Sequence, residues 1–167
     1  MEPVLVKRPT MTLVGFGFFG DPFKSSAGWT EENEIGRLWK RFSVFRDQQR
    51  IKNVLNDRVT YEVHIEHAET KQTGEYEVFV GVEVDSLEAV LVEMTVKLLP
   101  AVTYAVFTLQ GPEINSDWSR RIAEWMAQSG YRRPYPYGFQ RYDERFKGLE
   151  QIADSILDVC IPVERAP

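Results

Sequence analysis

The first part of the chain shows two different spacings of hydrophobic and polar residues. Residues 3–20 form a largely apolar extended stretch that is interrupted at Pro9 and then continues, which predicts a strand. Further along, apolar residues recur every three or four positions, and this spacing predicts a helix over Glu31–Gln49. Thr30 precedes two acidic residues and is the predicted N-cap of that helix.

The next part of the chain changes to strict alternation. Apolar and polar side chains alternate over residues 61–66 and again over residues 75–84, on either side of the turn sequence ETKQTG. Alternation with a period of two is typical of half-buried strands. The two stretches therefore predict a β-hairpin.

The same spacings return in the second half. Alternation predicts a strand over residues 102–109, another that begins at Tyr137 in the sequence YGFQRYDERF, and a last one over residues 156–163. Between the first two, a helical apolar stripe predicts a second helix that begins near Ser116. Gly130 stands where a left-handed C-terminal cap belongs.

Each half of the chain thus gives the order strand, helix, strand, strand. No linker or low-complexity segment interrupts the chain, so we predict one domain over residues 1–167. Two such halves predict an α+β fold with one curved antiparallel sheet and two helices on one face.

Alternation also indicates which side chains share a face of the sheet. We expect the helices to cover the valine-rich face, which leaves a second, open face. Its expected members are Glu62, His64, Glu66, Glu75, Glu77, Phe79, Gln140, Tyr142, Asp158 and Cys160. Such a face is either an ordinary solvated sheet surface or an aromatic-lined pocket that favours cations. Gln140 would bring hydrogen-bonding groups to its centre, but no charge.

Composition and charge restrict the partners. The formal net charge is −5 and the pI is about 5.2, which argues against nucleic acid or an anionic membrane surface as a partner. No apolar run approaches the ~18 residues of a membrane span, and Glu2 and Pro9 do not suit a signal peptide. With a single cysteine, Cys160, the chain forms no internal disulfide. We expect a cytoplasmic protein.

The residues give little support for metal, cofactor or nucleophilic chemistry. His64 and His67 stand three apart, and on a strand this spacing sends two rings to opposite faces, so we expect no metal site. Cys160 has no obvious basic partner, and a strand-buried thiol is usually inert. We assign no catalytic residue and no cofactor.

Six stretches, in this order, carry a resemblance to a known family over nearly the whole chain: NEIGRLWKRF, YEVHIE, TGEYEVFVGVEV, EWMAQSGY, FQRYDERF and LDVCIPV. The chain resembles the GyrI-like effector-binding family, also called the AraC-type or integron-associated effector-binding domain. This resemblance implies two strand-helix-strand-strand modules related by a pseudo-twofold axis. It also implies an aromatic-lined cleft between the modules that takes up amphipathic, often cationic, aromatic compounds.

The resemblance also implies roles for particular residues. Matching positions make Trp39, Tyr61, Trp118 and Tyr142 pocket walls. Gln140 stands where the family pattern often has the glutamate that anchors cationic ligands, and Cys160 stands where the last strand often has an aromatic residue. The predicted ligand-binding residues are therefore Trp39, Tyr61, Phe79, Trp118, Gln140, Tyr142 and Cys160.

We expect the chain to bind a small amphipathic, aromatic and in some cases cationic organic ligand for sensing or sequestration, as a stand-alone member without a DNA-binding domain. Two alternatives stay open, so the residues do not decide whether the protein is an enzyme. One is a hydrolase of cyclopropane-bearing genotoxic compounds, in which Glu83 or Glu93 activates water. The other is a module that interacts with a protein partner, such as a gyrase modulator.

Overall fold

The structure, a computed structural model, describes residues 2–28 and 30–167. Its described strands are β1 (Val4–Arg8), β2 (Met11–Gly20), β3 (Thr60–Ile65), β4 (Tyr76–Glu83), β5 (Thr95–Leu99), β6 (Val102–Gln110), β7 (Tyr131–Arg132), β8 (Tyr137–Tyr142) and β9 (Ile156–Arg165). Its described helices are α1 (Glu34–Gln48), α2 (Thr70–Thr73) and α3 (Trp118–Gln128), with 3₁₀ turns η1 (Gly111–Asn115) and η2 (Leu149–Asp154). Within the described residues, no helix is both long and apolar enough to cross a membrane.

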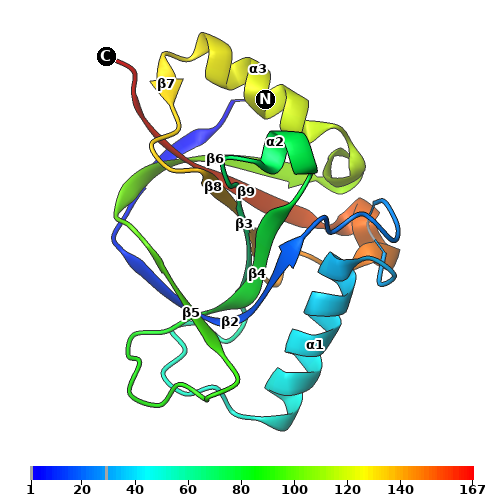
Figure 1. Ribbon diagram of the computed structural model, residues 1–167. Helices are drawn as coiled ribbons and strands as arrows, with labels where there is room; N and C mark the ends of the chain where they lie inside the picture. Colours follow the sequence, from blue (N-terminus) through cyan, green and yellow to red (C-terminus); the bar gives the residue numbers. More distant parts are fainter. Residues whose placement is uncertain (1, 29) are drawn as a thin grey trace.

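The strands form one antiparallel sheet in the order β1-β6-β9-β8-β3-β4-β2-β5, with β7 paired to β9 (Figure 1). The run β2-α1-β3-β4 is one module, and the run β6-α3-β8-β9 is the other. Their strands appear in mirrored order on either side of the β3–β8 pairing, so the predicted α+β fold of two strand-helix-strand-strand modules is confirmed. We call the β3–β8 pairing the seam.

The two ends of the sheet are joined by a long two-stranded ribbon. The β1–β6 pairing places Arg8 opposite Val102, and the β2–β5 pairing places Met11 opposite Leu99, in one and the same register. One side of the ribbon is β1 followed, past Pro9, by β2. The other side is β5 followed by β6, and the two sides pair along their length. As a result the sheet curls into a ring (Figure 1). β5 was not predicted from the sequence, because it is only five residues long and mostly exposed.

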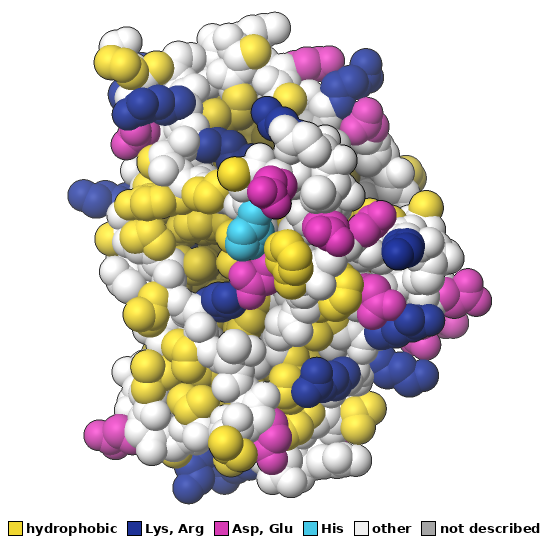
Figure 2. Space-filling view, viewed as in Figure 1, with side chains coloured by type: hydrophobic (Ala, Val, Ile, Leu, Met, Phe, Trp, Pro, Cys, Tyr) yellow, Lys and Arg dark blue, Asp and Glu magenta, His cyan; other side chains and the backbone are white. Residues whose placement is uncertain are grey.

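The inside of the ring is a packed apolar core. Its buried members are Met11, Leu13, Val59, Tyr61, Val63, Phe79, Leu99, Tyr104, Tyr137, Phe139 and Cys160. Hydrophobic side chains gather in Figure 2 where Figure 1 shows the centre of the ring. We call this cluster the ring interior. It is the face of the sheet that the helices leave uncovered, and it is neither a solvated surface nor an open pocket.

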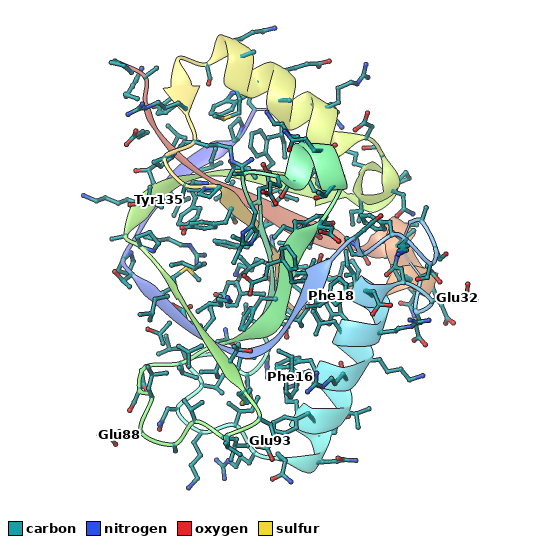
Figure 3. The ribbon with its side chains drawn as sticks, viewed as in Figure 1. Phe16, Phe18, Glu32, Glu88, Glu93 and Tyr135 are labelled. Atoms are coloured by element: carbon teal, nitrogen blue, oxygen red, sulfur yellow. The ribbon has the colours of Figure 1, made fainter. Side chains whose placement is uncertain are left out.

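Both long helices pack on the outer face of the ring, one on each module. From α1, Leu38 and Phe42 pack on β2 and β4, where Phe16 meets Phe42 edge-on with 6.3 Å between ring centroids. Phe16 and Phe18 lie between β2 and α1 in Figure 3. On the other module, Ile122 of α3 belongs to the cluster of β6 and β9. The prediction of two helices on one face is confirmed.

The helix boundaries differ from the prediction at their first residues. Asn33, not Thr30, caps α1, because its Oδ1 accepts a hydrogen bond from the Gly36 amide at 3.0 Å. Asp117 caps α3 in place of Ser116, whose hydroxyl instead bonds a carbonyl oxygen of η1 at 2.6 Å. The C-terminal end of α3 is as predicted, since Gly130 has a φ of 69°.

The predicted division of residues between the two faces is right for β4 and β9 and wrong for β3 and β8. Glu62 lies opposite Val80, so it shares the outer, helix-covered face, whereas Tyr61 lies opposite Gly81 on the inner face. Of the ten residues expected on the open face, Phe79, Asp158 and Cys160 face the ring interior while Glu62, Gln140 and Tyr142 face outward. Alternation groups residues within one strand, but a shift of one residue in register exchanges the two faces.

Candidate functional site

A row of side chains crosses the outer face of the sheet from one module to the other, and it is polar only at the seam. Successive strand pairings place these residues side by side: Phe16, Val80, Glu62, Gln140, Val159 and Phe107. Helix α1 covers the apolar part of the row in one module, and α3 covers it in the other. Glu62 and Gln140 therefore face each other where the two modules meet.

Glu62 is a buried acid. Only 4% of the residue is exposed, and Gln140 beside it is 5% exposed. Removing a carboxylate from water is costly unless other groups hydrogen-bond or neutralise it. The groups that surround Glu62 therefore define what this site can do.

Three side chains approach the Glu62 carboxylate. The Trp39 indole Nε1 donates to Oε2 at 2.5 Å, and His64 Nε2 lies 2.6 Å from Oε1. The Gln140 amide lies farther away, with its Nε2 3.5 Å from Oε1. Tyr142 donates its hydroxyl hydrogen to Gln140 Oε1 at 2.7 Å, which extends the network across the seam. We call these five residues the seam cluster.

The seam cluster contains no lysine or arginine. Among the described residues no lysine or arginine lies within ion-pair distance of Glu62, and His64 is the one partner that becomes a cation on protonation. The second buried acid, Asp158, contrasts with it, because Arg145 binds it directly and Arg141 lies 3.7 Å away. The Glu62 carboxylate is thus surrounded by hydrogen-bonding groups, and no lysine or arginine among the described residues neutralises it.

Aromatic rings surround the carboxylate. Trp39 is half-buried and meets the ring of Tyr142 edge-on, with centroids 4.7 Å apart. Tyr142 in turn meets Phe146 at 4.9 Å, and on the other side His64 lies 5.3 Å from Tyr76. Ring faces attract cations, so a carboxylate among aromatic rings favours a positively charged apolar group.

The two phenols of this environment remain neutral. Burial raises the pKa of Tyr142 well above its ordinary value, and the negative charge of Glu62 raises it further. Burial also raises the pKa of Tyr76, with smaller contributions from the charges of Glu62 and Asp21. Neither phenol adds negative charge to the site at neutral pH.

Helix α1 brings Trp39 to the seam. Leu38 and Phe42 are buried against the first module, and Trp39 lies on the flank of the helix that faces the second. The strands supply the other members of the cluster, because Glu62 and His64 alternate on β3 while Gln140 and Tyr142 alternate on β8.

The structure divides the predicted ligand-binding residues between two places. Trp39, Gln140 and Tyr142 come together in the seam cluster. Trp118 is half-buried and packs against the apolar cluster of the second module. Tyr61, Phe79 and Cys160, the other predicted members, lie on the opposite side of the sheet in the ring interior.

The contacts of these three inward residues are those of a packed core. The Tyr61 hydroxyl donates to Glu83 Oε2 at 3.1 Å, and Phe79 is fully buried. Burial raises the pKa of the Cys160 thiol to about 12, so the thiol stays protonated and a poor nucleophile. Of the two carboxylates considered as catalysts, Glu83 is the one bonded to Tyr61. Glu93 is exposed in the loop between β4 and β5, away from the ring (Figure 3).

Sequence reasoning missed the central role of Glu62 and His64. Both were recognised as polar positions of an alternating strand, and the missing information was the register between β3 and β8. That register places Glu62 opposite Gln140. The carboxylate that Gln140 does not supply thus comes from the neighbouring strand of the other module.

The fold and the seam define a class of protein: an α+β domain of two pseudo-symmetric modules with a buried polar pair between them. Residues 4–163 match the profile of the family described as integron-associated effector binding protein, Cass2. The chain belongs to this family, as the resemblance in the sequence predicted.

Individual relatives agree with this assignment. The chain is 30% identical over 165 residues to the transcriptional regulator BrlR of Pseudomonas aeruginosa. That match covers 98% of this chain but 56% of BrlR, so the chain spans little more than half the length of this relative.

Two solved structures share the fold. One is SAV2435 bound to tetraphenylphosphonium, with a TM-score of 0.71, 20% identity, and coverage of 98% of this chain and 94% of that one. The other is the integron cassette protein VCH_CASS2 of Vibrio cholerae, with a TM-score of 0.64, 17% identity, and coverage of 98% and 96%.

Proposed function

We propose that the chain binds a small amphipathic organic cation at the seam, with Glu62 as the counter-charge, and that it serves to sense or sequester this ligand. The observation that carries the proposal is a carboxylate only 4% exposed, in contact with the Trp39 indole and the His64 imidazole and without a guanidinium or ammonium partner among the described residues. The half-buried rings of Trp39 and Tyr76 beside it supply faces for the apolar part of such a ligand.

Two further observations support this choice of ligand. A protein of the same fold, SAV2435, is described as bound to tetraphenylphosphonium, an aromatic cation. The net charge of −5 favours a cationic small molecule over an anionic partner such as nucleic acid. In our proposal, the amide of Gln140 orients the carboxylate and Glu62 provides the charge.

The test is a fluorescence titration with tetraphenylphosphonium, which uses the signal of Trp39 beside the site. We expect Glu62→Gln to weaken binding by about 10- to 100-fold, or roughly 1.4–2.8 kcal/mol. Binding of triphenylphosphine oxide, a neutral compound with similar rings, should change much less. Glu69→Gln is the matched control, because Glu69 is exposed and its substitution changes the net charge by the same amount.

Equal affinities of Glu62→Gln and the unchanged protein for tetraphenylphosphonium would overturn the proposal. So would an equal loss in Glu69→Gln, since that result would mean that only the overall charge of the protein matters. Far-ultraviolet circular dichroism of both variants verifies that they are folded.

A further inference from the structure

We propose that His64 is the internal counter-ion of Glu62, and that a cationic ligand at the seam displaces its proton. The inference rests on the proposed function and adds a specificity-determining residue to it. Under this proposal, the protonation of one imidazole decides whether the seam distinguishes cations from neutral compounds.

The position of His64 suits this role. It stands two residues after Glu62 on the same face of β3, and its Nε2 lies 2.6 Å from Glu62 Oε1. Its side chain is 29% exposed, whereas that of Glu62 is 5% exposed. His64 therefore contacts the buried carboxylate and still exchanges protons with water.

The residues next to His64 on the neighbouring strands carry no charge. On β4, Val78 lies opposite it and Tyr76 lies beside it, and on β8 the opposite residue is Gly138, which has no side chain. Tyr76 is held neutral by the rise in its pKa, which burial causes first and the charges of Glu62 and Asp21 increase.

The next charged residue along the chain after His64 is already paired. Glu66, the next outward position, pairs with Arg133 at 2.9 Å. Among the described residues, His64 is thus the one source of positive charge in contact with Glu62.

The charge of the pair depends on the protonation of His64. With a protonated imidazole the His64–Glu62 pair is neutral overall, and the attraction for a second cation is small. With a neutral imidazole the pair carries one negative charge, because a neutral ring still donates one hydrogen bond to the carboxylate. A ligand with a permanent positive charge therefore binds the deprotonated pair better.

Thermodynamic linkage gives this exchange a measurable form. If cation binding favours neutral His64, then protonation of His64 must weaken cation binding by the same factor. Because only one proton is exchanged, the affinity for the cation can fall by at most tenfold for each decrease of one pH unit. Histidine side chains ordinarily change charge between pH 5 and 8. A neutral ligand gains nothing from the negative charge, so its affinity should not follow this change.

The experiment is isothermal titration calorimetry with tetraphenylphosphonium between pH 5.5 and 8.5, in buffers that differ in ionisation enthalpy. We expect the affinity to fall by up to tenfold per pH unit over part of this range as the pH is lowered, with release of up to one proton per bound cation in the same part. His64→Gln keeps a donor for Glu62 but does not titrate, so its affinity should be nearly independent of pH. His67→Gln is the matched control, since His67, the other histidine of the chain, is exposed.

Each outcome has a separate meaning. Binding without a pH dependence or proton release in the unchanged protein overturns the role of His64 and leaves the proposed function intact. The same pH dependence in His64→Gln overturns it as well. Absence of binding at every pH contradicts the proposed function itself. The proton count is measured on the unchanged protein, so the test does not depend on the folding of any variant.

Discussion

At the scale of single residues, the site depends on two positions that face each other across the seam. The family pattern often has an anchoring glutamate at position 140, where this chain has the uncharged Gln140. Glu62 lies opposite it and supplies the carboxylate from the other module. In our proposal, Glu62 supplies from β3 the charge that the family resemblance places on β8.

This pairing predicts the result of Gln140→Glu. The new carboxylate would stand near Glu62, at about the 3.5 Å that now separates the Gln140 amide from Glu62 Oε1. Two carboxylates this close do not both ionise, so the pKa of one is raised in the folded state. We expect no simple gain in cation affinity, and a stability that decreases as pH rises above the value at which the unfolded chain loses this proton.

Thermal unfolding at pH 5.5 and pH 8 measures this effect. Each tenfold change in the ionisation constant on folding corresponds to about 1.4 kcal/mol, so the Tm of Gln140→Glu should be lowered more at pH 8. Gln72→Glu, at an exposed position, is the control and should show no such difference. A Tm change that is equal at both pH values would contradict the facing arrangement.

At the scale of elements, the first turn of α1 fixes the helix that carries Trp39. Asn33 is 1% exposed, accepts from the Gly36 amide, and donates through Nδ2 to the Gly28 carbonyl at 2.7 Å. Thr30, the cap predicted from sequence, only accepts from the Glu32 amide at 3.2 Å in the preceding turn. The buried Asn33 side chain joins the helix to the loop before it, whereas the Thr30 hydroxyl bonds only within its own turn.

We therefore expect Asn33→Ala to lower the free energy of unfolding by about 1–2 kcal/mol, as for other lost N-caps. Thr30→Ala should cost less than about 0.5 kcal/mol, because its hydroxyl bonds within an exposed turn. Urea denaturation followed by circular dichroism gives both values. The reverse order of the two effects would show that the helix is capped at Thr30 after all.

At the scale of the whole molecule, the ribbon of β1–β2 and β5–β6 ties the modules together. The strands β2 and β6 belong to different modules. β1, which precedes β2 in the chain, pairs with β6, and β5, which precedes β6, pairs with β2. The ring interior takes side chains from both modules, and Tyr104 and Tyr137 share a hydrogen bond of 2.7 Å inside it. Neither module completes its core alone.

This closure predicts that the chain unfolds in one step. We would compare two variants that retain a single tryptophan by Trp→Phe replacement elsewhere, one with Trp39 in the first module and one with Trp125 in the second. In each variant the urea transition followed by fluorescence should coincide with that followed by circular dichroism. A tryptophan signal that changes well before or after the loss of secondary structure would show that the modules unfold separately.

The sequence by itself determined most of the local structure. Alternation and helical spacing are properties of neighbouring residues, so they located the β3–β4 hairpin, both long helices and the strands β6, β8 and β9. The family resemblance rested on the same local stretches and was confirmed. Of the predicted site residues, Trp39, Gln140 and Tyr142 were brought together by the fold.

Only the tertiary structure decided which face of each strand is covered and which residues meet across the seam. A period of two does not say which of two faces a helix will cover, and the register between β3 and β8 depends on packing of residues more than seventy positions apart. That register placed Glu62, with His64 beside it, at the centre of the seam cluster. Closure of the sheet placed Tyr61, Phe79 and Cys160 in the interior of the ring, because it turns the uncovered face into an apolar core.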